Sequence, residues 1–123
     1  MKNNLKHEIM WWMSRLTIMM TSLFLSMTLA AQAYAAEIQM GYEGNLVFEP
    51  NEVTVNAGET VTFVNNALPP HNIIVDGRAD LSRESLMFSP GETQEIVFAD
   101  AGDFNFKCAP HEGAGMKGVI HVK

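Results

Sequence analysis

The only cysteine of the chain lies in a short segment that is rich in potential metal ligands. In the stretch CAPHEGAGMKG, Cys108 is followed by His111 and then by Met116. A thiolate, an imidazole and a thioether are soft ligands. Together with a second histidine they form a trigonal copper site with a long axial methionine bond, which serves electron transfer. The spacing therefore predicts a copper site of this kind.

A second histidine is found by elimination. His7 lies near the N-terminus, and His121 lies between Ile120 and Val122, so it faces solvent if these two neighbours face the core. His71 remains, at the start of a predicted strand, where the two preceding prolines restrict the backbone. The expected metal ligands are His71, Cys108, His111 and Met116.

Other sites use the same residue types. A Cys–His pair is a nucleophile and base in some hydrolases, but a domain of fewer than about 90 residues has little room for a substrate cleft. Zinc or copper storage is a second alternative, although structural zinc sites rarely use methionine. A single Cys, His or Met is most often a core or surface residue. The grouping of all three within one loop favours the copper site.

Period-two alternation predicts how the cysteine is oriented. In the segment DFNFKC, Phe104, Phe106 and Cys108 lie on the same face of a strand, and the two phenylalanines must face the core. The intervening residues, Asp103, Asn105 and Lys107, then face solvent. We therefore expect the thiol to point inward where the strand enters the loop that carries His111.

The rest of the domain also reads as short strands separated by turn residues. The expected strands lie within residues 51–58, 59–66, 71–77, 92–102, 103–108 and 118–123. Strands rich in Val, Ile, Phe and Thr at this spacing predict an antiparallel sandwich or barrel. We expect residues 92–102 and 103–108 to pair through the turn at 100–102. One short helix is expected in RADLSRESL, residues 78–86.

The composition changes near residue 36. Three basic residues precede the uncharged segment 16–36, which ends in AQAYAAE and offers a small-x-small cleavage site. This pattern predicts a cleaved signal peptide at residues 1–35 and one domain at residues 36–123. Cleavage is expected after Ala33, Ala35 or Ala36. An uncleaved membrane anchor is the alternative, because about 20 apolar residues span a bilayer, but Thr, Ser and Gln dilute this run.

The charge of residues 36–123 limits the class of partner. This segment has 13 acidic and 5 basic residues, a net charge of −8. Such a charge argues against nucleic acid as a partner and favours cationic proteins through long-range steering. A single cysteine cannot form an internal disulfide. In an exported protein, that thiol is a reactive group, an intermolecular bridge or a metal ligand.

Several segments resemble plastocyanins of the cyanobacterial type, which belong to the cupredoxins. CAPHEGAGMKG resembles their copper loop, VNNALPPHNIIVD the segment that carries the first histidine ligand, LMFSPGET the segment between these two, and LVFEP the early strand. The similarity covers nearly all of residues 37–123. Pseudoazurins share the C-x2-H-x4-M spacing and halocyanins have similar loops, so the PPHN and LMFSPGE segments favour plastocyanin.

The resemblance implies an all-β cupredoxin Greek-key sandwich of about eight strands that holds one type 1 copper ion. Such a protein is a monomeric electron carrier and not an enzyme. It would be reduced transiently by cytochrome f of the cytochrome b6f complex and oxidised by photosystem I, in the thylakoid lumen at the membrane periphery. The backbone of Asn72 would support the cysteine sulfur. The docking face around His111 would comprise Leu46, Leu68, Pro70, Glu112 and Ala114.

Three features depart from the plastocyanin pattern. Lys107 occupies the position of a surface tyrosine, and Glu112 the position where many cyanobacterial members have arginine. The segment DGRADLSRES is shorter than usual and contains two arginines, so an acidic patch of the plant type is weak. These departures spare the metal ligands and affect the partners. The alternatives are a pseudoazurin-like or halocyanin-like carrier with a respiratory partner, or a copper storage protein.

Overall fold

The computed structural model describes residues 6–11, 13 and 34–123. The chain divides into two units, Met1–Ala31 and Gln32–Lys123. In the first unit, residues 6–11 and 13 are helical. Among the described residues, no helix has the length and apolar character needed to cross a membrane. Most of the predicted signal peptide, residues 1–35, lies outside the described residues, so its cleavage stays a prediction.

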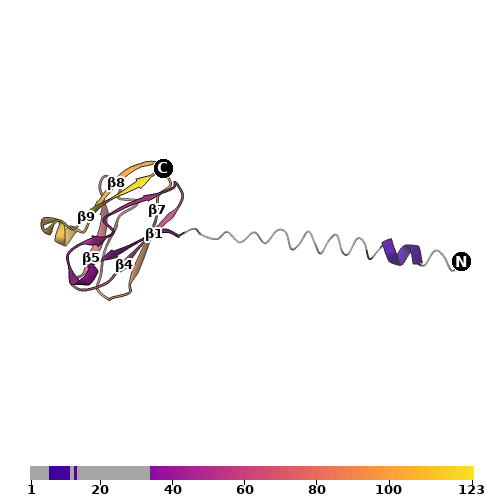
Figure 1. The fold of residues 1–123 in the computed structure, drawn as a ribbon, viewed down its shortest axis with the longest axis horizontal. Coiled ribbons are helices and arrows are strands. Elements are labelled where there is room, and N and C mark those ends of the chain that lie inside the picture. The colour runs from indigo at the N-terminus through magenta and orange to yellow at the C-terminus, as the bar shows by residue number, and fades with distance from the viewer. Residues whose placement is uncertain (1–5, 12, 14–33) are drawn as a thin grey trace. The chain divides into compact units, whose positions relative to one another are not determined.

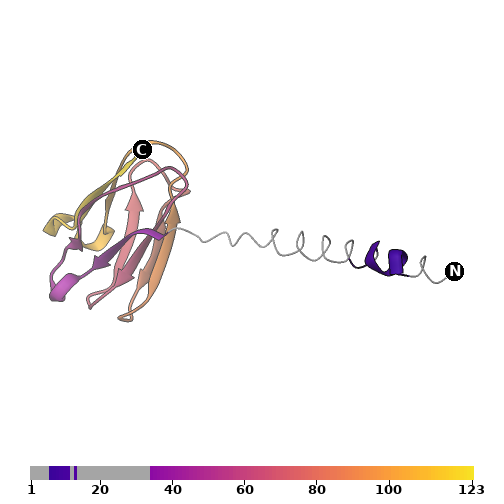
Figure 2. The same ribbon diagram turned by 45° about the vertical axis from the view of Figure 1, so that its right-hand side comes forward.

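Residues 34–123 form a sandwich of two β-sheets (Figures 1 and 2). The first sheet has the strand order β2-β1-β4-β7. β1 pairs with β4 in parallel and with β2 in antiparallel orientation, and β4 pairs with β7 in antiparallel orientation. The strands are β1 (Tyr34–Met40), β2 (Phe48–Glu49), β4 (Thr60–Asn65) and β7 (Thr93–Val97).

The second sheet has the strand order β3-β9-β8-β5-β6. β3 and β9 are parallel, and the other neighbours are antiparallel. Its strands are β3 (Glu52–Val55), β5 (His71–Val75), β6 (Arg83–Met87), β8 (Gly102–Lys107) and β9 (Lys117–Val122). Two short 3-10 helices, η1 (Tyr42–Gly44) and η2 (Ala109–Ala114), lie at the end of the sandwich opposite the C-terminus (Figures 1 and 2).

Three phenylalanine rings join the two sheets in the core. Phe48 and Phe63 come from the first sheet and Phe106 from the second, and all three are buried. Their rings meet edge to face, with centroids 4.7–6.2 Å apart. Such contacts are worth about 0.5–1.5 kcal/mol each beyond the area they bury. The cluster fixes the inward face of β8, and Cys108 follows on the same face and is fully buried.

The predicted all-β sandwich is confirmed, with nine strands in residues 34–123 instead of about eight. The predicted pairing of residues 92–102 with 103–108 is wrong, because β7 lies in the first sheet and β8 in the second. The chain crosses between the sheets after Val97. Phe98 is buried and packs against Phe104 at a centroid distance of 5.2 Å, so an apolar contact anchors this crossing.

The short helix expected at residues 78–86 is also misplaced. This segment is a turn at residues 79–81 followed by β6. Ser82 closes the turn, since its Oγ accepts from the Val75 N–H at 2.9 Å and lies 3.0 Å from the Arg78 carbonyl oxygen. Beyond it, β6 pairs with β5. The helical turns of residues 34–123 lie in η1 and η2 instead.

Candidate metal centre

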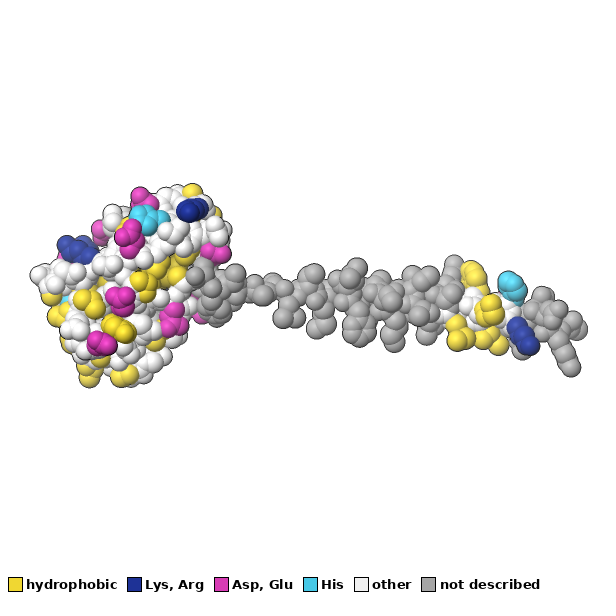
Figure 3. All heavy atoms as spheres, in the orientation of Figure 1, with side chains coloured by type: hydrophobic (Ala, Val, Ile, Leu, Met, Phe, Trp, Pro, Cys, Tyr) yellow, Lys and Arg dark blue, Asp and Glu magenta, His cyan; other side chains and the backbone are white. Residues whose placement is uncertain are grey.

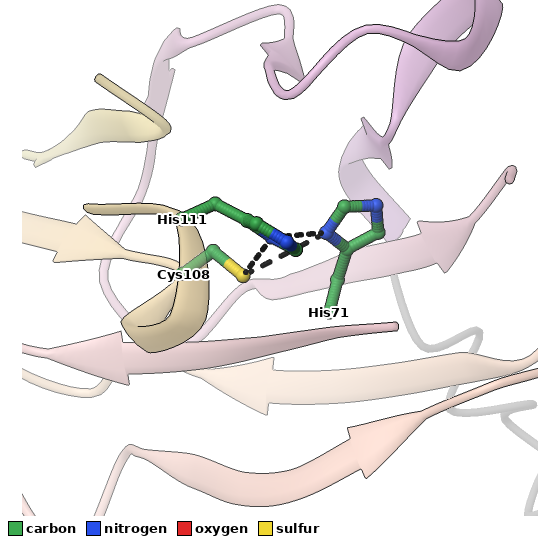
Figure 4. A group of neighbouring side chains, drawn as sticks. All are labelled: His71, Cys108 and His111. Carbon is green, nitrogen blue, oxygen red and sulfur yellow. Dashed lines mark hydrogen bonds between the residues drawn. The ribbon is translucent and has the colours of Figure 1, made fainter. Parts of the chain in front are cut away.

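The structure brings three of the predicted ligands together, from two segments far apart in the sequence. His71 Nδ1 lies 3.2 Å from His111 Nδ1 and 3.7 Å from Cys108 Sγ. His111 Nδ1 lies 3.3 Å from the same sulfur. The three side chains point toward one another (Figure 4). Among the described residues, this is the one group of three or more His, Cys, Asp or Glu residues with metal-binding spacing.

The triangle formed by these atoms has the size of a metal site. A point equidistant from the two nitrogens and the sulfur lies about 2 Å from each. Bonds from a first-row metal such as zinc measure about 2.0–2.1 Å to histidine nitrogen and about 2.3 Å to thiolate sulfur. The donor set and its spacing therefore fit one metal ion, and two imidazoles with a thiolate suit copper.

The loop after β8 holds its own shape through backbone hydrogen bonds. The Cys108 N–H donates to the Met116 carbonyl at 3.1 Å, and the His111 N–H donates to the Cys108 carbonyl at 3.1 Å. Gly115 adopts a φ of +87°, where glycine is favoured, as η2 ends. Met116 is fully buried. The loop thus closes at its base and holds Met116 in the interior beside Cys108.

His71 and Cys108 are shielded from solvent, and this changes their pKa values. Burial and the nearby His111 lower the pKa of His71, which favours the neutral imidazole that binds metals. The Ala67 carbonyl opposes this shift, but the Nε2 atom of His71 has no hydrogen-bond partner of good geometry. Burial raises the pKa of the Cys108 thiol. Metal binding must therefore displace a proton from the sulfur.

Asn72 connects the strand that carries His71 to the loop that carries His111. Its side-chain Oδ1 accepts from the Ala109 N–H at 2.8 Å, and its Nδ2 donates to the Glu84 carbonyl at 3.1 Å. Hydrogen bonds from the backbones of Asn72 and His111 to the Cys108 sulfur also lower the pKa of the thiol, against the effect of burial. Asn72 therefore acts on the sulfur and on the loop together.

The residues predicted to form a docking face differ in exposure. Leu68 is 61% exposed, whereas Leu46 is half-buried and packs against the core. Pro70 and Glu112 are half-buried, and Ala114 is exposed. His111 is also half-buried. Their role as a docking face stays a prediction.

Sequence reasoning missed the ion pairs beside the site. Lys107 Nζ lies 3.0 Å from Glu112 Oε1 and 3.7 Å from Asp76 Oδ1, and Lys117 Nζ lies 3.9 Å from Glu112 Oε1. The sequence offered one signal for such a pair, because the basic Lys107 precedes Cys108 and the acidic Glu112 follows His111. Glu112, at a position where many cyanobacterial members have arginine, thus pairs with two lysines.

A model of copper-binding proteins of the plastocyanin/azurin family matches residues 35–123. A chloroplastic plastocyanin of the moss Physcomitrium patens is 43% identical over 106 residues, which cover 79% of this chain and 63% of that protein, just under two thirds of its length. A plastocyanin of the green alga Scenedesmus fuscus is 49% identical over 88 residues, which cover 65% of this chain and 90% of that protein.

The solved structures agree with these sequence matches. A mutant plastocyanin of a fern superposes with a TM-score of 0.65 at 32% identity, covering 71% of this chain and 99% of that one. The fern protein thus has the same kind of sandwich as residues 34–123 of this chain.

Proposed function

Because the chain belongs to the plastocyanin/azurin family of copper-binding proteins, we propose that it is a one-electron carrier and transforms no substrate. The residues that hold the copper ion are His71, Cys108, His111 and Met116. The observation that carries the proposal is the convergence of two Nδ1 atoms and one sulfur within 3.7 Å of one another. When bound, copper supplies the one-electron couple between Cu(II) and Cu(I).

The protein holds the proposed ligands rigidly, excludes water from most of the site and leaves one edge of the site, at His111, accessible to solvent. His71, Cys108 and Met116 are fully buried, so three of the four proposed ligands cannot exchange with solvent. The self-bonded loop and the Asn72 contacts hold the side chains in place before metal binds. A fixed site has little need to rearrange between the two oxidation states. His111 alone is half-exposed, and electrons would enter and leave near its ring.

The visible spectrum of the copper-loaded protein tests this proposal. We expect an intense blue band from charge transfer between the Cys108 thiolate and Cu(II). Cys108→Ser should abolish the band, because the serine hydroxyl stays protonated and gives no thiolate. A colourless copper-loaded protein, or a preference for zinc over copper in competition, would count against the type 1 site.

Reversible electrochemistry separates a carrier from a storage protein. A carrier should pass repeatedly between the oxidised and reduced forms while it retains its metal, because its ligand positions suit both. A storage protein needs to hold copper in one oxidation state only, so it should lose copper, or change its ligands, when it is cycled between the two states. Metal content measured after repeated cycles distinguishes these two results.

We also propose where the carrier works. Similar proteins include chloroplastic plastocyanins, which supports a place in the thylakoid lumen between cytochrome f and photosystem I, with transient contact to each. The net charge of −8 over residues 36–123 supports cationic docking sites on both partners. Flash-induced reduction of photosystem I by the reduced protein tests this. No transfer there, with fast transfer to a respiratory acceptor, would favour the pseudoazurin-like alternative.

A further inference from the structure

Gly41, which directly follows β1, lies against the ring of His71. A Cβ atom built on Gly41 would lie 2.7 Å from His71 Nε2 and 3.4 Å from its Cδ2. It would also lie 3.2 Å from the Ala67 carbonyl oxygen. The opposite nitrogen, Nδ1, faces Cys108 and His111 (Figure 4). A side chain at position 41 would therefore press on the His71 ring from the side opposite its ligand nitrogen.

The backbone of Gly41 is held in place on both sides. Its N–H donates to the Val47 carbonyl at 3.0 Å, and its own carbonyl accepts from the Gly44 N–H at 3.0 Å. The preceding residue, Met40, is fully buried and its carbonyl accepts from the Asn66 N–H at 2.8 Å. The end of β1 cannot move without breaking these bonds, so the ring must yield to an added side chain.

The ring is positioned by packing on this side. His71 is fully buried, and the Ala67 carbonyl acts on its ring, although Nε2 forms no hydrogen bond of good geometry. A metal-binding histidine is usually oriented by a hydrogen bond from its second nitrogen. Here the close backbone of Gly41 limits how far the ring can move away from Cys108.

From these contacts we infer that Gly41 is a positioning residue for His71. Gly41 has no side chain, and hydrogen bonds fix its backbone. The space it leaves therefore determines how close His71 Nδ1 comes to Cys108 and His111. This inference rests on the proposed copper site, to which it adds a residue 30 positions away from His71 in the sequence.

Gly44 provides a matched control in the same turn. Gly41 has a φ of +74° and Gly44 a φ of +78°, so an alanine meets similar backbone strain at either position. A Cβ on Gly44 meets nothing within 4 Å. The variants Gly41→Ala and Gly44→Ala thus share the strain and differ in the contact with His71. Asparagine tolerates positive φ better than alanine, so Gly41→Asn and Gly44→Asn form a second pair with less strain.

The experiment compares both pairs in the metal-free and copper-loaded states. In the metal-free protein, the NMR signals of the His71 ring should shift in the Gly41 variants and stay unchanged in the Gly44 variants. In the copper-loaded protein, the Gly41 variants should show an altered electron paramagnetic resonance spectrum and a changed potential. Their copper affinity should fall by about 10-fold to 100-fold, as for other residues that orient metal ligands.

Two results would overturn the inference. The first is that matched Gly41 and Gly44 variants have the same His71 ring signals, the same spectra and the same copper affinity. The other is failure of both Gly41 variants to fold while both Gly44 variants fold, because β1 and not the ring would then have yielded. Both results leave the copper proposal intact as long as the wild-type protein is blue. A colourless wild-type protein would contradict the proposed function itself, whatever the ring signals show.

Discussion

At the scale of single residues, Met116 is the proposed ligand that would bind the metal most weakly, as methionine does in copper sites of this kind. It is fully buried and its backbone carbonyl accepts from the Cys108 N–H. We expect Met116→Leu to fold, because Leu and Met have similar volumes and such exchanges usually cost less than about 1.5 kcal/mol. The variant should stay blue but have a higher reduction potential, since the loss of an axial donor disfavours Cu(II).

Voltammetry of the wild type and Met116→Leu measures this effect. An unchanged potential would show that Met116 is not a ligand. Loss of all copper binding would show that it does more than tune the site.

Glu112 belongs to a group of ion pairs that the sequence analysis did not predict. It pairs with Lys107 and Lys117, and its hydrogen bond to Lys107 raises the pKa of that lysine. Glu112→Arg would break both pairs and gather three cations beside His111. We expect electron transfer to photosystem I to change several-fold at low salt and much less at high salt, because salt screens exposed charges.

The matched control is Glu49→Arg, which makes the same change of charge on β2, at an edge of the other sheet. Flash-induced reduction of photosystem I should respond less to this variant than to Glu112→Arg. Equal responses would mean that the position of Glu112 is unimportant and that only the net charge matters.

The sequence predicted the inward orientation of Cys108 because a single strand with period-two alternation determines it. The contact between Gly41 and His71 was not predictable in this way. It depends on where the end of β1 meets the start of β5, and these strands lie in different sheets. The Lys107–Glu112 pair depends on how η2 folds back over the end of β8. Contacts between elements need the three-dimensional fold.

At the scale of strands, His121 ties together three neighbours in the second sheet. From β9, its Nδ1 lies 2.6 Å from Asp103 Oδ1 on β8, and its Nε2 lies 2.7 Å from Glu52 Oε1 on β3. Hydrogen bonds raise the pKa of His121 above 6.5, and the bond to Asp103 contributes more than the bond to Glu52. As expected, this side chain is partly exposed while Ile120 and Val122 are buried.

These ion pairs predict a pH dependence of stability. Because the pKa is higher in the folded than in the unfolded chain, the protonated histidine favours folding. This stabilisation is fully present below pH 6.5 and is lost as the pH rises through the raised folded value. Between pH 5.5 and pH 9, the metal-free wild type should therefore lose more thermal stability than His121→Gln. Parallel losses would show that the pairs contribute nothing.

Strand positions were predicted better than strand partners. The apolar runs at residues 59–66, 71–77 and 118–123 all contain strands, because burial of alternate side chains leaves a local pattern. β6 was missed because its sequence, RESLM, begins with three polar residues and has only one buried residue, Met87. The pairing of β7 with β8 was predicted wrongly from the turn sequence between them. Such a turn can connect two strands of one sheet, and it can also connect strands in different sheets.

At the scale of the whole molecule, charge should govern encounter and apolar contact should govern transfer. Acidic side chains are spread over the visible face of the sandwich, with few basic ones among them (Figure 3). Transfer to a cationic partner should therefore slow as salt rises, because the Debye length is about 8 Å at physiological ionic strength. Leu68→Ala should lower the rate at every salt concentration, since Leu68 is 61% exposed and its contact does not depend on charge.

A salt series of flash-induced transfer, with wild type and Leu68→Ala, separates these two effects. Thermal unfolding of both proteins serves as the control, because an exposed leucine contributes little to stability. A rate that rises with salt in the wild type would contradict steering by the acidic surface. An unchanged rate in the variant would place the apolar docking face elsewhere.

The order of strands in the two sheets also bears on how the protein resists self-association. The four edge strands are β2, β7, β3 and β6, and each carries an exposed glutamate: Glu49, Glu95, Glu52 and Glu84. An unpaired edge is a template for pairing with a second chain, and charged side chains on it discourage such growth. Arg83 also donates to the Glu95 carbonyl at 2.9 Å, which occupies one acceptor of the β7 edge. Two copies that met edge to edge would bring these glutamates close together, and their repulsion disfavours growth of the sheets from one molecule into the next.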